Sequence, residues 1–180
     1  LFAKYLTIMT ALMLVSYLVL ASSLMVFISN RWAKETQAML KTNVQQCAEY
    51  GASLFSECNS TSDVDRAMVI ISNNIGITGS AIDADIFFSN HEGNVLLCRE
   101  DFLYSFSASD RGCLVHSGYK IPKEIMDTVK KGEYFSTQEV PGLFAEDTFF
   151  AGYPVYVHGQ FIGAFFASTP IQPKLTEYAS

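Results

Sequence analysis

Residues 148–169 decide the fold, and they read TFFAGYPVYVHGQFIGAFFAST. Apolar residues that favour β-structure fill both halves, and the His-Gly pair at 158–159 between them is a two-residue turn signal. The stretch therefore predicts an antiparallel hairpin of two strands, Thr148–Val157 and Gln160–Thr169. Pro154 lies inside the first strand and cannot donate a ladder hydrogen bond, so it predicts an edge or a bulge at that point.

Two helices are predicted upstream of this hairpin. Residues 33–58 contain no Pro, and apolar or small residues recur there at spacings of four and three, which indicates one face of a long helix. A second helix is expected after a break, with Ser62 as its amino-terminal cap. We expect it to stop at Gly76 and Gly79.

The chain between these helices and the closing hairpin predicts further strands and one short helix. In residues 82–98, two stretches of β-like apolar pattern are separated by a turn, which predicts a first hairpin. Residues 99–120 form a long irregular connection, and connections of this length are uncommon unless functional. A proline, early acids, late lysines and a final glycine mark a short helix over residues 122–131. Residues 134–140 then read as another strand.

The first 32 residues predict a membrane segment. Tyr5–Ile28 holds 24 residues without Asp, Glu, Lys, Arg or His, and as a helix it spans roughly 36 Å, enough for a bilayer core. Trp32 beside Arg31 is typical of an interfacial anchor. A removable signal peptide is the alternative, but the stretch exceeds the apolar region of such peptides. We therefore expect a retained transmembrane helix with flanks over residues 1–32.

The orientation of this helix does not follow from counting charges. Arg31, Lys34 and Lys41 follow the helix while only Lys4 precedes it, which by itself would place the rest of the chain inside the cell. The chain starts at Leu1, however, and we expect that a basic amino-terminal stretch belongs in front of it. Our expectation is a cell-membrane protein whose residues 33–180 are extracytoplasmic.

Composition and motifs exclude several classes of function. The formal net charge of −6 disfavours nucleic acid as a partner. The sequence carries none of the short motifs typical of nucleophilic hydrolases, zinc proteases, nucleotide-binding loops or zinc ligands, although it contains four cysteines. We therefore predict no catalytic residue, no metal and no cofactor, so that this chain is not an enzyme.

Four stretches carry a resemblance to a known family. They are ADIFFSNHEGNV at 84–95, IPKEI at 121–125, FFAGYPV at 149–155 and GQFIGAFF at 159–166. In this order the chain resembles the single Cache sensor domains, extracytoplasmic and PAS-like, of bacterial transmembrane sensor histidine kinases. The resemblance implies an α+β fold: a PAS-like five-stranded antiparallel sheet with a long N-terminal helix behind it, preceded by one transmembrane helix. The sensor domain would occupy residues 33–170, with 171–180 as a linker toward a second transmembrane helix.

The resemblance also implies a function. The chain would be the extracellular ligand-sensing domain of a membrane-bound signal-transduction receptor, most plainly a two-component sensor histidine kinase whose catalytic region lies elsewhere. One alternative is the sensor domain of a chemoreceptor or of a cyclic-dinucleotide enzyme. Another is a membrane-anchored PAS-like module that binds or assembles with another protein.

In related folds the long loop and short helix enclose a pocket on the sheet. Cations and hydrogen-bond donors in this loop would suit a small molecule that bears a carboxylate. The candidate ligand-binding residues are Arg99, Arg111, His116, Tyr119 and Lys120, with Tyr153 on the neighbouring strand. For each of them a solvated loop charge or ordinary packing is the alternative.

Two further hypotheses concern cysteines and subunits. Cys98 and Cys113 flank the long loop, and a disulfide between them would stabilise the fold by about 3 kcal/mol in the chain-entropy model; two buried thiols are the alternative. Receptors of the resembled type act as homodimers. The apolar stripe along one face of the long helix could either pack on its own domain or contact a second subunit. The candidate dimer face is Leu40, Val44, Cys47 and Leu54.

Overall fold

The structure is a computed structural model that describes residues 2–99, 119–137 and 147–171. The elements in chain order are α1 (Phe2–Ser56), α2 (Thr61–Ile82), β1 (Asp85–Asn90), β2 (Val95–Cys98), α3 (Lys123–Val129), β3 (Tyr134–Ser136), β4 (Thr148–Val157) and β5 (Gln160–Pro170). The chain divides into two compact units, Leu1–Thr36 and Gln37–Ser180, with α1 continuing from the first into the second.

The first unit is the apolar part of α1. Its large side chains between Tyr5 and Ile28 are exposed, Met25 for example at 75% and Tyr17 at 70%. Within the described residues, one helix is long and apolar enough to cross a membrane, and its most apolar window has a mean hydropathy of 2.4. An apolar helix whose side chains find no protein partner is suited to hydrocarbon. The predicted uncharged span is therefore helical over its whole length.

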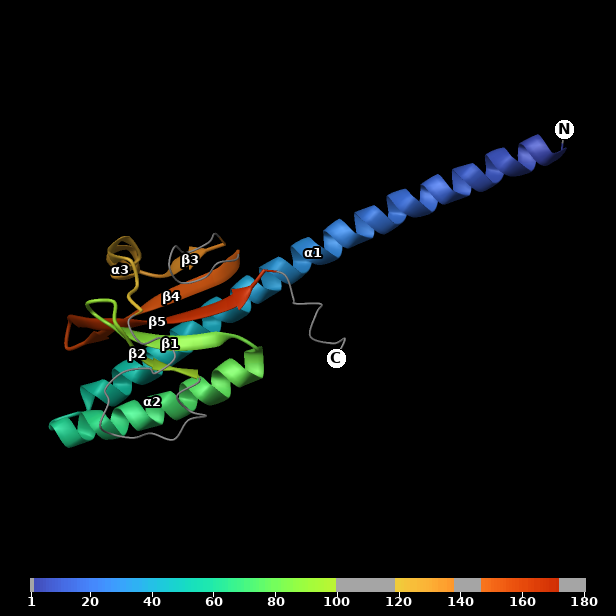
Figure 1. Cartoon of the computed structure of the whole chain (residues 1–180). Coiled ribbons are helices and arrows are strands. Elements are labelled where there is room, and N and C mark those ends of the chain that lie inside the picture. Colours follow the sequence, from blue (N-terminus) through green and yellow to red (C-terminus); the bar gives the residue numbers. More distant parts are fainter. Residues whose placement is uncertain (1, 100–118, 138–146, 172–180) are drawn as a thin grey trace. The chain divides into compact units, whose positions relative to one another are not determined.

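The second unit is built on one antiparallel sheet with the strand order β2-β1-β5-β4-β3 (Figure 1). The β4–β5 hairpin turns at His158 (φ 50°) and Gly159 (φ 79°). Two successive positive φ angles are the geometry of a type I′ turn, which matches the twist of the flanking strands. The α+β fold with a PAS-like five-stranded antiparallel sheet and a long N-terminal helix, predicted from the sequence, is confirmed.

Pro154 lies where β4 can accommodate a residue without an N–H group. The partner strand β3 pairs only with Phe150, Ala151 and Gly152 of β4, so β4 has no described neighbour on that side at Pro154. The register between β4 and β5 also shifts between Val155 and Tyr156. Both features predicted for this proline, a free edge and a bulge, occur together.

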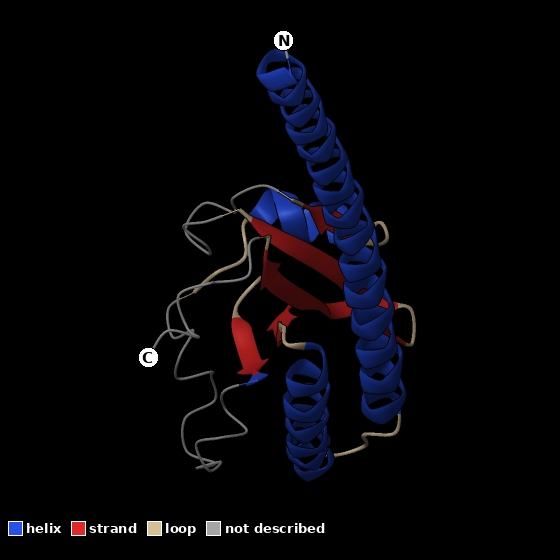
Figure 2. Cartoon of the chain, turned by 90° about the vertical axis from the view of Figure 1, so that its right-hand side faces the viewer, coloured by secondary structure: helices blue, strands red, loops and turns tan. Residues whose placement is uncertain are grey.

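Helices cover both faces of the sheet. The part of α1 after Gln37 lies with α2 on one face, which we call the helix face, and α3 lies on the other, the α3 face (Figures 1 and 2). Lys41 pairs with Glu133 at 2.9 Å, and Phe55 contacts the ring of Phe88 at 5.8 Å between centroids. Because Glu133 precedes β3 and Phe88 belongs to β1, α1 runs along the helix face from the β3 edge of the sheet to β1.

The bounds of α2 correct two sequence predictions. Its cap is Ser60, whose hydroxyl accepts a hydrogen bond from the Asp63 N–H, and not Ser62. The helix also continues through Gly76 and Gly79 and ends at Asp83, which adopts the left-handed conformation (φ 50°). A Cβ at Gly79 would lie 2.8 Å from the Ala84 carbonyl oxygen. This glycine therefore permits a close return of the chain and does not terminate the helix.

The apolar stripe of α1 packs within its own domain. Leu40, Val44 and Cys47 are 0%, 1% and 4% exposed, and Leu54 is half-buried. The Cys47 thiol lies 3.6 Å from the Asn74 side-chain oxygen on α2. The burial of Leu40, Val44 and Cys47 favours packing on the chain's own domain over contact with a second subunit, and the dimer face stays a prediction.

Candidate functional site

The α3 face of the sheet carries three stacked aromatic rings. Phe87, Phe150 and Phe166 are at most 1% exposed. The Phe150 and Phe166 rings are parallel within 1° at 5.1 Å between centroids, and Phe87 stacks on Phe166 at 5.6 Å. Such offset pairs add to the stabilisation from burial alone. The three central strands thus present a continuous aromatic floor.

Helix α3 packs directly on this floor. Its apolar side chains Ile125, Met126 and Val129 are buried. At Gly152, a Cβ would lie 2.6 Å from the Phe166 ring and 3.2 Å from Val129, so only a glycine lets the strand, the ring and the helix meet. Where the resemblance implied a polar pocket, the described residues between α3 and the sheet form an apolar core.

Tyr119 is the one described ligand candidate that belongs to this core. It is half-buried and packs against the cluster of Phe87, Phe166 and the α3 side chains. The chain beside it is held to the β1–β2 turn, since the Ile121 N–H donates to the Gly93 carbonyl oxygen at 2.8 Å. Burial raises the pKa of Tyr119 to about 12, so its hydroxyl keeps its proton and remains a donor at physiological pH.

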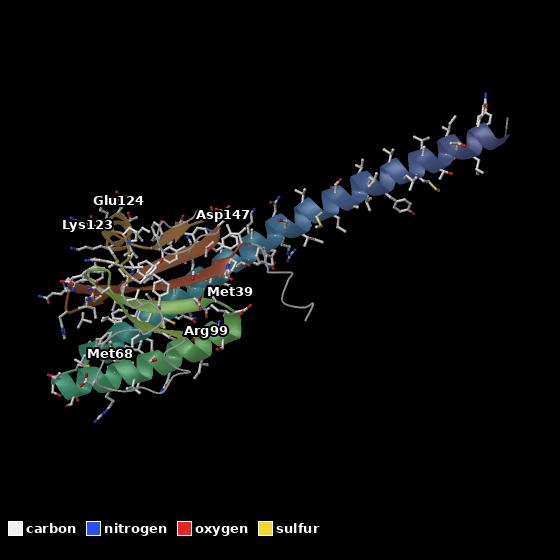
Figure 3. All side chains as sticks on the ribbon, viewed as in Figure 1. Met39, Met68, Arg99, Lys123, Glu124 and Asp147 are labelled. Atoms are coloured by element: carbon white, nitrogen blue, oxygen red, sulfur yellow. The ribbon has the colours of Figure 1, made fainter. Side chains whose placement is uncertain are left out.

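Arg99 lies on the opposite side of the sheet (Figure 3). Its guanidinium donates to the Ala84 carbonyl oxygen at 3.4 Å and lies 4.0 Å from the Asp83 carboxylate. Its methylene carbons would be 3.1 Å from a Cβ at Gly79. A cation beside the carboxyl end of α2 is favourably placed for the helix dipole. The described contacts of Arg99 are therefore structural ones, at the end of α2.

The remaining candidates do not converge either. Tyr153 stands opposite Phe165 in the β4–β5 ladder, and Phe165 contacts Gly51 of α1, so Tyr153 also belongs to the helix face. Lys120 is exposed and forms an isolated bridge with Asn94. Arg111 and His116 lie outside the described residues. The structure therefore does not bring Arg99 and Tyr153 together with Tyr119, because Arg99 and Tyr153 lie on the helix face and Tyr119 packs under α3.

Sequence reasoning missed the aromatic floor, although a signal for it was present. The sequence contains Phe-Phe at 87–88, 149–150 and 165–166, and the three pairs fall on β1, β4 and β5. Because successive strand residues point to opposite faces, each pair sends one ring to the helix face and one to the α3 face. Three such pairs on adjacent strands predict an apolar core on both sides.

The predicted disulfide stays a prediction. Cys98 is 1% exposed and lies in the cluster beneath α3, whereas Cys113 lies outside the described residues. A search of the described residues finds no group of three His, Cys, Asp or Glu side chains that could hold a metal ion.

Comparisons with known proteins give structural neighbours and no sequence family. No family model matches the chain, and no curated protein matches it. One similar structure is the ligand-binding domain of the Campylobacter jejuni chemoreceptor Tlp3 in complex with L-norvaline, at 12% identity and a TM-score of 0.48 over 76% of this chain. Another is the sensor domain of the Vibrio cholerae histidine kinase DctB, at 15% identity and 0.41 over 84%. The first is the ligand-binding domain of a chemoreceptor and the second the sensor domain of a histidine kinase.

A third similar structure is an extracellular ligand-binding receptor from Desulfohalobium retbaense, with 16% identity and a TM-score of 0.48 over 81% of this chain. The chain spans 55% of the Tlp3 domain, 52% of the DctB domain and 24% of the third receptor. With these identities and scores, the likenesses assign no ligand and no binding residue to this chain.

Proposed function

We propose that the chain is a membrane anchor followed by the extracytoplasmic sensor domain of a signal-transduction receptor, of the sensor histidine kinase type. The observation that carries this proposal is the continuity of α1. One uninterrupted helix, Phe2–Ser56, contains the uncharged span Tyr5–Ile28 and supplies a layer of the PAS-like domain in its last part. A change in the seating of α1 on the sheet thus acts on the same helix that crosses the membrane.

The sheet offers a short route between its two faces. Phe166 of β5 stacks with the aromatic floor under α3. The adjacent Phe165 points to the other face, where its ring lies 2.8 Å from the position of a Cβ on Gly51 of α1. If the domain has two conformations that differ in the position of α3, a ligand or partner with a higher affinity for one of them would shift β5, and with it the contact on α1. Only unequal binding of this kind can move such an equilibrium.

A small molecule is the ligand that this proposal favours. The similar Tlp3 domain has been solved with L-norvaline, with L-valine and with isoleucine, and as part of the proposal we extend to the present chain a small ligand that bears a carboxylate. A homodimer in the membrane is likewise proposed. Its contact would use surfaces other than the buried residues Leu40, Val44 and Cys47.

A second candidate function is favoured by one observation. The described space under α3 is filled by apolar side chains, as expected of a PAS-like module that binds another protein and no small ligand. In that case α3 would move because a protein partner contacts its outer surface, which carries Lys123, Glu124 and Asp127.

The test is a thermal-stability panel on the full chain in lipid nanodiscs. The probes are L-valine, L-norvaline, L-isoleucine, succinate and citrate, each at 1 to 10 mM (about the concentration at which even weak ligands act). A ligand at 100 times its dissociation constant stabilises the folded state by about 2.7 kcal/mol. Saturable stabilisation by any probe supports the sensor proposal. No stabilisation by any of them supports the protein-binding alternative in its place.

A further inference from the structure

A groove lies at the turn end of the sheet, away from the face that α1 covers. It is lined by His91, Lys130, Tyr156, Gln160, Phe161 and Ile162, and its volume is about 560 Å³. We call it the turn groove. The β1–β2 turn, the end of α3 and the β4–β5 hairpin each contribute to it, so three separate elements meet there. The groove is open to solvent, since His91, Lys130, Tyr156 and Gln160 are exposed.

The walls of the turn groove carry hydrogen-bond donors that no described acceptor takes up. Among the described residues, no ion pair or side-chain hydrogen bond involves the Lys130 ammonium group, the His91 ring or the Gln160 amide. The lining contains no Asp or Glu, although the chain as a whole carries a net charge of −6. Lys130 is thus the one charged side chain among the lining residues, and its positive charge favours an anion.

The base of the turn groove is apolar and continuous with the core. Phe161 packs against the cluster under α3, and its ring contacts that of Tyr156 at 5.6 Å between centroids. The Lys130 ammonium group lies 5.8 Å from the centre of the Phe161 ring. The Tyr156 hydroxyl donates to the Lys130 carbonyl oxygen, which ties β4 to the end of α3. A cation and an aromatic surface are thus held side by side.

We propose that the turn groove binds a small organic acid whose carboxylate meets Lys130, His91 and Gln160 and whose apolar part lies on Phe161. The absence of a carboxylate from the lining distinguishes this ligand from a free amino acid, whose ammonium group would find no counter-ion there. Binding would fix the end of α3 against the β4–β5 hairpin. This proposal names a ligand class for the proposed sensor, and it rests on that function for its consequence, though not for the binding itself.

The experiment is titration calorimetry on the full chain in nanodiscs with three matched probes. Phenylacetate carries the ring and the carboxylate, phenylacetamide is its neutral isostere, and L-phenylglycine is phenylacetate with an ammonium group added at the α-carbon. Lys130→Met removes the charge but keeps an unbranched apolar side chain. Lys131→Met is the matched control, because Lys131 is the next residue, is also exposed and does not line the groove.

We expect phenylacetate to bind, and both other probes to bind at least about fivefold more weakly. This is the change in dissociation constant expected when one exposed ion pair is lost. Lys130→Met should weaken phenylacetate binding by about the same factor, while Lys131→Met leaves it unchanged. The proposal is overturned if phenylacetate fails to bind, if its amide binds equally well, or if the two lysine variants behave alike. Should an amino acid stabilise the chain in the panel above while phenylacetate does not bind, the groove proposal fails and the sensor proposal stands.

Discussion

Gly51→Ala tests whether α1 is seated on the sheet as described. The added Cβ would lie 2.8 Å and 3.1 Å from two carbons of the Phe165 ring, where carbon atoms normally approach to about 3.5 to 4.0 Å. Phe165 is fully buried and contacts the Phe88 ring at 4.9 Å, so its ring has no free space to move into. Overpacking of this kind costs about 1 to 3 kcal/mol.

An opposing effect makes the sign of the result informative. Alanine in place of glycine inside a helix stabilises it by about 0.8 to 1.0 kcal/mol. The clash should outweigh this gain, and we expect a net loss of about 1 kcal/mol in the free energy of unfolding. Ser53→Ala is the control on the same helix: Ser53 is exposed and its hydroxyl donates to the Tyr50 carbonyl oxygen of that helix, so this variant changes only local helix interactions and should alter the free energy of unfolding by no more than about 0.5 kcal/mol.

The assay is urea unfolding of the full chain in detergent micelles, followed by near-ultraviolet circular dichroism of the aromatic residues. Phe165→Leu in the Gly51→Ala background should cost less than Phe165→Leu alone, because the smaller side chain relieves the clash. If Gly51→Ala instead stabilises the protein by about 1 kcal/mol, as propensity alone requires, the close contact between α1 and β5 does not exist.

Three further predictions concern the helices of the domain. Ser60→Ala should lower the free energy of unfolding by about 1 kcal/mol and Ser62→Ala by much less, because Ser60 is the cap; equal losses would contradict the assigned helix start. The hydroxyl of Ser60 and the Asn59 N–H hold the pKa of Asp63 below its usual value. The ionised carboxylate therefore stabilises the folded state at a pH above the usual pKa of Asp, and this stabilisation is lost as the pH falls through the lowered pKa. In Ser60→Ala the pKa of Asp63, measured by NMR titration, should therefore rise. Burial raises the pKa of the Cys47 thiol to about 11, so iodoacetamide at pH 8 should modify Cys47 at least about tenfold more slowly than the more exposed Cys58. A disulfide-linked dimer through Cys47 in the folded protein would refute the own-domain packing of the stripe.

Much of the fold followed from local signals in the sequence. The His158-Gly159 pair set the closing hairpin because both residues adopt positive φ angles, a requirement that few residue pairs meet. Pro154 marked the free edge and the bulge because it lacks an N–H group. The extent of α2 did not follow, since Gly79 resembles a stop signal although its role is a close approach to Ala84.

The candidate site was harder to predict than the fold. Arg99, Tyr119 and Tyr153 were grouped because they share chemistry and neighbouring elements, but the side of the sheet is set by pairing. Tyr153 stands opposite Phe165 on the helix face, and Tyr119 packs under α3. His91 and Lys130 are far apart in the sequence and meet at the turn groove only through the strand order. Tertiary register, which no local pattern encodes, decides which of these side chains can act together.

The most direct test of the central claim is the side of the membrane on which the domain lies. Alkaline phosphatase, which is active only outside the cytoplasm, would be fused after Ser180 and expressed in a Gram-negative host, with green fluorescent protein at the same position as the matched cytoplasmic reporter. The sensor account predicts high phosphatase activity and no fluorescence, with the fusion remaining in the membrane fraction through α1. A fluorescent, phosphatase-inactive fusion would place the domain inside the cell and contradict the account.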